Sequence, residues 1–256
     1  MGLLSRGNPM SLVNDQLVLI CGESATGKSA SLANLVNQER VLYLNCEAGK
    51  KLPFRNKFDT KIITDPYQVM EAFEYTMPGK PGHGLYDVIV IDTLTFLMDM
   101  FESMYVLRSA NTMQGWSNYQ QFFKELMQEK VAASDKSVIF LAHTRADYDE
   151  KELDFKVKVP VKGALQNNGI EAYFSTVVAT KKVSIKDLDN YKNPLLVITP
   201  EDELLGYKYV FQTRLTAKTK GERIRSPMGM FTTAETYINN DAQKLLEHLN
   251  IFYNFN

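Results

Sequence analysis

The sequence predicts an α/β domain with a mostly parallel central sheet, flanking helices and an antiparallel extension at one edge. Three observations support this fold class. Four short apolar runs, at 17–20, 41–45, 88–91 and 137–142, alternate with stretches of helical periodicity, which is typical of parallel sheets. A glycine-containing turn directly follows the first run and leads into a predicted helix. The 256 residues are 45% hydrophobic and 23% charged, which suits one globular domain with a substantial core.

Charge and cysteine content exclude some classes of protein and leave others open. The 29 Lys and Arg residues balance 30 Asp and Glu residues, so net charge does not favour nucleic acid, and any basic surface must be local. Cys21 and Cys46 follow apolar runs and are expected to pack as small hydrophobes in a reducing, cytoplasmic environment. The sequence lacks both an apolar run of about 18 residues and a signal-peptide core, so we expect no membrane partner.

The domain organisation is predicted to be simple. Residues 1–16 form a lead-in that is either loosely held or docks on a neighbouring subunit. Residues 17–256 form a single domain, since their length suits one large α/β unit.

The segment 17–29 reads LVLICGESATGKS and matches the phosphate-binding pattern G-x-x-x-x-G-K-[ST]. The matching residues are Gly22, Gly27, Lys28 and Ser29, and Glu23, Ser24, Ala25 and Thr26 complete the loop. The two glycines allow the tight backbone that turns N–H groups toward phosphate oxygens. Lys28 is expected to reach the β- and γ-phosphates, and the Ser29 hydroxyl is expected to bind Mg²⁺. The sequence therefore predicts a site for a nucleoside triphosphate with Mg²⁺.

A helix over 29–38 should follow the loop, with Leu32, Leu35 and Val36 on its buried face and its positive dipole end at the phosphates. The next strand, 41–45, leads to Glu47. Because the carboxyl ends of parallel strands face the ligand crevice, Glu47 is either the base that activates the attacking water or an exposed acid.

The middle of the chain continues the pattern of strands and helices. A strand at 61–64 and a helix from Pro66 to Thr76, with Asp65 as N-cap, precede a glycine-rich turn. Four β-branched residues at 88–91 then predict a strand buried on both faces, which delivers Asp92 to its carboxyl end. We interpret Asp92 as the second metal-holding acid, in preference to a helix cap.

Residues 94–133 are predicted to be mostly helical, with a polar loop at 108–115 and a second helix from Trp116. The strand at 137–142 ends in His143, which either senses the γ-phosphate or is a structural histidine. A long loop, 144–163, carries acids first and bases later, and its segment 155–159 also suits a hairpin arm.

The last part of the chain is predicted to be largely antiparallel. After a short helix within 163–169, strands are expected at 173–183, 195–199 and 207–215, and a closing helix at 240–249. A basic cluster at 214–225 includes Lys218 and Lys220 and is either a solvated hairpin tip or a phosphate-binding surface.

The order of these parts resembles the RecA-like P-loop ATPases. The resemblance rests on the loop at 22–29, the strand ending near Glu47, the strand ending in Asp92 and the strand ending in His143. It spans roughly residues 10–230, which leaves no room for the additional DNA-binding domains of full-length recombinases. The chain is therefore most similar to the minimal, core-only RecA-like proteins of bacteriophages, which act in recombination or single-strand annealing.

This resemblance implies a set of roles. Glu47 would be the catalytic base beside Lys28 and His143, with ATP and Mg²⁺ bound at subunit interfaces of a filament or ring. Lys218 and Lys220 would reach the neighbour's γ-phosphate. Single-stranded DNA would bind the loop 144–163 and, more weakly, 107–115; the candidate contacts are Arg145, Lys156, Lys158, Lys162 and Arg108. A single-strand DNA-binding protein is a further expected partner, and the location would be the cytoplasm of a bacterial host.

Two departures from the family pattern keep other functions open. His143 stands where recombinases usually have Gln or Asn, and the first half of the long loop is acidic. One alternative is a minimal ring helicase or motor ATPase. The other is a regulatory, non-motor ATP-binding module with a protein partner.

Overall fold

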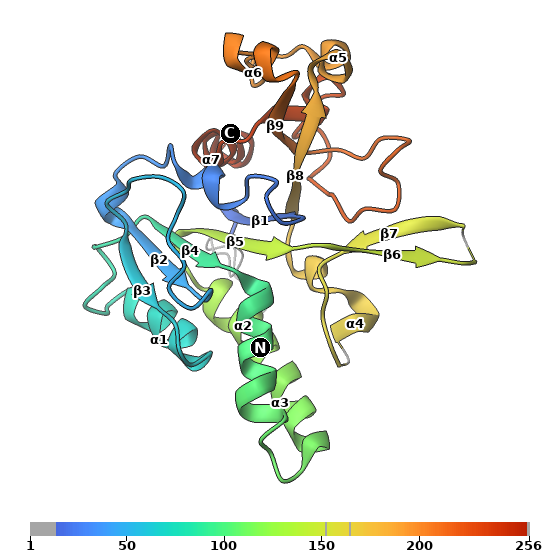
Figure 1. Cartoon of the computed structure of the whole chain (residues 1–256). Coiled ribbons are helices and arrows are strands. Elements are labelled where there is room, and N and C mark those ends of the chain that lie inside the picture. The colour runs from blue at the N-terminus through green and yellow to red at the C-terminus, as the bar shows by residue number, and fades with distance from the viewer. Residues whose placement is uncertain (1–13, 152, 164, 255–256) are drawn as a thin grey trace, which may run out of the picture.

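An eight-stranded sheet forms the centre of the computed structural model, which describes residues 14–151, 153–163 and 165–254 (Figure 1). Most of the predicted lead-in, 1–16, lies outside the described residues. The strand order is β10-β9-β8-β1-β5-β4-β2-β3. The strands are β1 (Leu17–Gly22), β2 (Val41–Asn45), β3 (Asp59–Ile62), β4 (Val88–Asp92), β5 (Ser137–His143), β8 (Thr176–Ser184), β9 (Tyr207–Gln212) and β10 (Tyr237–Asn239).

The pairing confirms the predicted fold class. The six strands from β8 to β3 pair in parallel, while β9 pairs antiparallel with both β8 and β10. The apolar, β-branched sequences of β1, β2, β4 and β5 fit strands that are buried on both faces. A mostly parallel sheet with an antiparallel edge results.

Helices cover both faces of this sheet (Figure 1). On one face, α1 (Tyr67–Thr76), α2 (Leu94–Phe101) and α3 (Thr112–Glu125) pack against alternate strand residues such as Leu19. On the other face, α7 (Ala242–Tyr253) packs against the intervening residues, such as Ile20. The period-2 alternation of the strands thus divides the core into two apolar layers.

The remaining helices are short. They are α4 (Leu165–Asn168), α5 (Ile185–Leu188), α6 (Pro200–Leu205) and the helical turns η1 (Ser29–Leu32), η2 (Gln38–Arg40), η3 (Glu102–Val106), η4 (Leu126–Val131), η5 (Ile170–Tyr173), η6 (Asp189–Tyr191) and η7 (Ala234–Thr236).

The predicted helix over 29–38 is wrong. The chain forms only the four-residue 3₁₀ turn η1, and Val36 is 56% exposed instead of buried. Groups in this segment bond to distant residues in place of a helical ladder: the Asn34 side-chain amide donates to Asp241 at 2.8 Å, and the backbone N–H of Val36 donates to the Gln243 side chain at 3.2 Å. Contacts with the α7 region therefore hold the segment, and no long helix dipole faces the loop.

Three other expectations also need correction. Residues 195–199 form no strand, and the unpredicted helix α6 follows them. The strand expected at 61–64 lies at 59–62, and the helix expected from Trp116 already begins at Thr112.

The long loop 144–163 is mostly a hairpin. Strands β6 (Arg145–Asp149) and β7 (Asp154–Lys158) pair antiparallel, and the hairpin projects away from the main sheet (Figure 1). Strand β7 agrees with the prediction from the sequence that 155–159 also suits a hairpin arm.

Candidate active site

The candidate site lies where four neighbouring parallel strands end. In the register, Gly22 at the end of β1 is opposite His143 at the end of β5, and Asn45 at the end of β2 is opposite Asp92 at the end of β4. The loops after β1 and β2 add Lys28, Ser29 and Glu47. These side chains line one cavity of about 460 Å³ together with Asp92 and His143, as expected for the carboxyl edge of such a sheet. The sequence-predicted catalytic and metal-binding residues are therefore brought together.

The loop that follows β1 has a tightly turned backbone. Ala25 and Gly27 adopt left-handed conformations, with φ of 60° and 99°. The Thr26 hydroxyl donates to the Glu23 carbonyl at 2.7 Å and lies 2.6 Å from the Thr180 hydroxyl of β8. This side-chain contact ties the loop to the strand beside β1.

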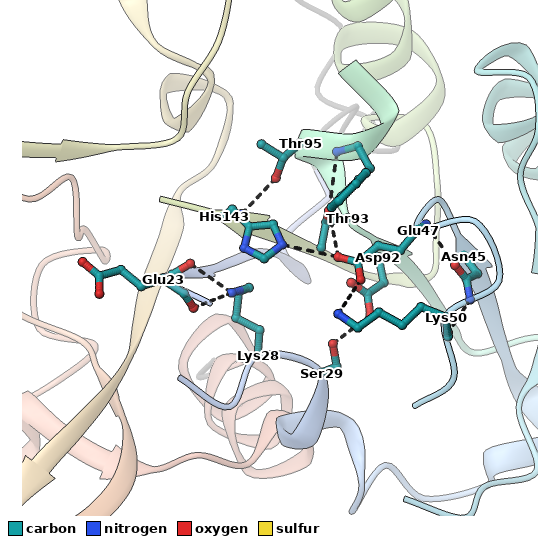
Figure 2. A network of polar contacts seen from close by, with 12 residues as sticks. Glu23, Lys28, Ser29, Asn45, Glu47, Lys50, Asp92, Thr93, Thr95 and His143 are labelled. Carbon is teal, nitrogen blue, oxygen red and sulfur yellow. Dashed lines mark hydrogen bonds and ion pairs between the residues drawn. The ribbon is translucent and has the colours of Figure 1, made fainter. Parts of the chain in front are cut away.

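Lys28 is buried inside the loop, with 6% of its surface exposed. Its ammonium donates to the carbonyls of Gly22 at 3.0 Å and Glu23 at 2.7 Å (Figure 2). Burial lowers the pKa of Lys28, and the nearby carboxylate of Asp92 opposes that effect. The lysine is thus placed at the cavity with its charge aimed at the loop.

Ser29 and Asp92, the two residues predicted to bind the metal, are hydrogen-bonded to each other. The Ser29 hydroxyl donates to Asp92 Oδ2 at 2.9 Å, and the Tyr43 hydroxyl donates to the same oxygen at 2.6 Å (Figure 2 shows the Ser29 contact). Burial raises the pKa of Asp92 despite these hydrogen bonds. Among the described residues, Asp92 Oδ1 is buried without a hydrogen-bond partner.

This donor set fits Mg²⁺. Hydroxyl and carboxylate oxygens are hard ligands, and Mg²⁺ in nucleotide sites is bound by one or two protein groups plus phosphates and water. The unpartnered Asp92 Oδ1 is a buried acceptor that such a bound ion or its water would satisfy. No cluster of three or more His, Cys, Asp or Glu residues suited to a metal occurs in the described ranges, so an all-protein cage is not formed there.

Glu47 faces the cavity with 8% of its side chain exposed. Its Oε1 lies 3.4 Å from His143 Nε2 and 3.5 Å from the Thr93 hydroxyl, while its Oε2 lies 2.8 Å from Lys50 Nζ (Figure 2). The hydrogen bond from His143, and then the contact with Lys50, lower the pKa of Glu47 to about 2 against the effect of burial. Glu47 is therefore a carboxylate at neutral pH.

His143 is positioned by α2. Its backbone N–H donates to the Thr95 hydroxyl at 2.9 Å, and its ring meets the edge of Phe96 with centroids 6.0 Å apart. Its Nε2 is left to face Glu47.

Eight lining residues were not among the predicted site residues: Ala30, Tyr43, Lys50, Lys51, Leu52, Pro53, Tyr209 and Asn240. Asn240 is 213 positions from Gly27, yet its amide donates to the Gly27 carbonyl at 2.9 Å. Tyr209 approaches the same glycine from β9. For Lys50 and Lys51, three and four residues after Glu47, the sequence held a local signal, because they lie close to the predicted base.

Lys218 and Lys220 do not line this cavity. Lys218 has 88% of its side chain exposed and lies 4.0 Å from Asp187, and Lys220 lies 3.3 Å from Asp154 of the β6–β7 hairpin. Their expected contact with a neighbouring subunit's nucleotide stays a prediction.

The residues predicted to bind DNA come from different segments of the chain. Arg145 and Lys158 lie on the hairpin, and both pair with Asp147, at 2.8 Å and 3.7 Å. Lys156 is on the same hairpin, whereas Lys162 contacts Glu102 of η3. Arg108 lies in the turn between η3 and α3.

A protein-family model described as an AAA domain matches residues 14–193. The chain belongs to this AAA domain family. A search of curated proteins finds no match. The matched range covers β1, β2, β4 and β5 with the loops that carry Lys28, Ser29 and Glu47. Tyr209 and Asn240 lie beyond it, so the antiparallel edge and the segment before α7 complete the cavity from outside the matched range.

Membership of the AAA domain family supports the coarser part of the prediction. The chain is of the P-loop NTPase type, and the family implies nucleotide binding and ATPase activity. In the part of the chain that the structure describes, every helix is too short or too polar to cross a bilayer.

Proposed function

We propose that this AAA domain protein hydrolyses ATP with Mg²⁺ and acts on single-stranded DNA in recombination, strand annealing or replication. The observation that carries the ATPase part is the meeting of Ser29 with Asp92, beside Lys28 and Glu47, in one cavity. Ser29 and Asp92 would hold Mg²⁺, which supplies charge neutralisation at the phosphates when bound.

The chain's own groups have distinct roles in this proposal. The loop N–H groups and Lys28 bind and orient the phosphates. Glu47, ionised at neutral pH, accepts the proton of the attacking water, and His143 holds the Oε1 side of its carboxylate. The Thr93 hydroxyl contacts the Glu47 carboxylate, and the Thr95 hydroxyl holds the backbone N–H of His143.

The proposed DNA contact is the β6–β7 hairpin. The hairpin begins two residues after His143. A movement of His143 on nucleotide binding would therefore be transmitted to the hairpin through only a few backbone bonds. Tyr148 and Phe155 are 54% and 57% exposed, and their rings stack edge to face 5.3 Å apart. Exposed aromatic rings beside Lys156 and Lys158 suit a chain of unpaired bases.

Self-association is part of the proposal. A filament or ring would place ATP at subunit interfaces, where Lys218 and Lys220 would reach the neighbour's γ-phosphate. The exposure of Lys218 supports this, because the side chain is accessible for such a contact.

A second candidate function has its own observation. Asp147 accepts both Arg145 and Lys158, so the hairpin neutralises much of its own positive charge. That arrangement favours a protein partner over phosphate groups and corresponds to a regulatory ATP-binding module.

The decisive experiment measures ATP hydrolysis with and without single-stranded DNA for the wild type, Glu47→Gln and the control Glu71→Gln, an exposed acid on α1. We expect Glu47→Gln to lower kcat about 10²- to 10⁴-fold, and Glu71→Gln to leave it unchanged. Normal hydrolysis by Glu47→Gln would show that the assigned base is wrong.

DNA dependence is read from the same assay and from binding over a salt series. Stimulation by DNA, with an affinity that falls steeply as salt rises, supports the recombination function. Lys156→Ala with Lys158→Ala should weaken that binding, while Lys124→Ala on α3 should not. A rate of ATP hydrolysis that is unchanged by single-stranded DNA at low salt would instead favour the regulatory module with a protein partner.

A further inference from the structure

Lys50 is a cation at the cavity that the phosphate-binding motif does not include. The turn that carries it is fixed by the buried Asn45, whose amide donates to the Lys50 carbonyl at 2.9 Å and whose carbonyl accepts the Glu47 N–H at 2.9 Å. Ala48 and Gly49 adopt left-handed conformations, with φ of 51° and 78°, and so reverse the chain between Glu47 and Lys50. The backbone of Lys50 is therefore held in place beside the site.

The side chain of Lys50, in contrast, has room to move. It is 68% exposed, while its partner Glu47 is 8% exposed. The ion pair of 2.8 Å occupies Glu47 Oε2, and His143 and Thr93 face Oε1. Both oxygens of the proposed base thus have polar partners in this state (Figure 2).

An incoming triphosphate would compete for this ammonium. Lys28 lies in the same cavity and is buried against two loop carbonyls, so Lys50 is the more mobile of these two cations. A γ-phosphate carries more negative charge than one carboxylate and would lie near Glu47 if Glu47 activates the attacking water. A diphosphate lacks that group.

We propose that Lys50 senses the triphosphate: its ammonium pairs with Glu47 in the empty and ADP-bound protein, and moves to the γ-phosphate of bound ATP, which frees Glu47 Oε2. This inference rests on the proposed ATPase function and adds a residue to it. Lys50 then couples recognition of the third phosphate to release of the base. With a bound diphosphate, Glu47 stays paired with Lys50.

The test is calorimetric titration of the full chain with ADP and with a non-hydrolysable ATP analogue, each with Mg²⁺. Lys50→Met should lower the affinity for the analogue about tenfold, because a charge-assisted hydrogen bond is lost. The same variant should leave the affinity for ADP within about twofold of the wild-type value. Lys50→Arg should restore most of the affinity for the analogue. The control Lys57→Met, an exposed lysine farther along the same segment, should change neither affinity.

Glu47→Gln supplies the sharper comparison. Without the carboxylate, Lys50 is no longer held, so this variant should bind the analogue more tightly than the wild type and bind ADP unchanged. The gain should vanish in Glu47→Gln/Lys50→Met. The inference would be overturned if the gain in affinity for the analogue persists in the double variant. It would also be overturned if Lys50→Met loses affinity for ADP and for the analogue equally. A wild type that binds neither nucleotide would instead overturn the proposed function.

Discussion

Gly22→Ala tests whether the phosphate-binding loop is held by contact with β8. A Cβ at Gly22 would lie 2.2 Å from the Thr180 hydroxyl oxygen, 2.8 Å from the Thr26 hydroxyl oxygen and 3.0 Å from the Thr180 carbonyl oxygen. Thr180 is 1% exposed and lies in a strand paired with β1, so it has no space into which to withdraw. The substitution must shift the loop or the strand.

The expected destabilisation combines two effects. Overpacking of a close-packed site costs about 1–3 kcal/mol, and separation of the 2.6 Å Thr26–Thr180 contact costs roughly another 1 kcal/mol. We expect the free energy of unfolding to fall by about 2–4 kcal/mol in urea denaturation, and nucleotide affinity to fall with it. Gly84→Ala is the matched control: nothing lies within 4 Å of its Cβ position, so its effect should stay within about 0.5 kcal/mol.

A double-mutant cycle with Thr180→Ala separates steric overlap from other effects of the new methyl group. Thr180→Ala alone loses the contacts with Thr26 and the Cys21 carbonyl. In that background the nearest clashing atom is gone, so Gly22→Ala should cost about 1 kcal/mol less than in the wild type. An equal cost in both backgrounds would refute the steric reasoning.

Three further predictions concern the core and the titratable groups. The pKa of Glu47 lies at about 2 in the folded protein, below the ordinary value of 4.5, so ionised Glu47 stabilises the fold above about pH 4.5 and this contribution is lost as the pH falls toward 2. The difference in urea midpoint between the wild type and Glu47→Gln should therefore change between pH 5 and 3 and stay constant from pH 6 to 8; a constant difference throughout would contradict the shift. Burial raises the pKa of Cys21 to about 12 and raises that of Cys46 as well, so a thiol reagent at pH 8 should label neither until urea is added; rapid labelling of the folded protein would show that they are accessible. Phe140→Ala, at a fully buried site in the central strand β5, should destabilise by about 3–5 kcal/mol, whereas Phe155→Ala, 57% exposed on the hairpin, should cost below about 1 kcal/mol; similar values for the two would refute the burial argument.

The strands that build the site could be predicted because their signals are local. The apolar runs at 17–20, 41–45, 88–91 and 137–142 are long enough and sufficiently β-branched to specify buried parallel strands. Since such strands end at one edge, the positions of Asp92 and Glu47 near one another followed from the pattern.

Helix α6 also had local signals, and these were missed. Thr199 and Asp202 form a capping box, Pro200 is the first helical residue, and Gly206 ends the helix in a left-handed conformation. The apolar residues before Thr199 were instead interpreted as a strand. Start and stop signals were better evidence here than the short apolar run.

The remaining differences depend on tertiary contacts that sequence patterns do not report. The helix expected at 29–38 is replaced by bonds from Asn34 and Val36 to residues of the α7 region, about 207 positions away. Asn240 and Tyr209 likewise reach the cavity from outside the six parallel strands, through contacts with residues that are distant in the sequence. Such residues can be identified as part of the site only from the folded structure, in which the antiparallel edge packs against the loop.

The hydrogen bond between Asn240 and Gly27 also has a consequence for how the protein is made. A ribosome adds about 5–20 residues per second, so roughly ten to forty seconds separate the synthesis of these two residues. During that interval the emerging loop has its motif but lacks one of the side chains that hold its backbone. The nucleotide site is therefore completed only after Asn240 has been synthesised, and a nascent chain that has not yet folded its antiparallel edge should bind nucleotide poorly.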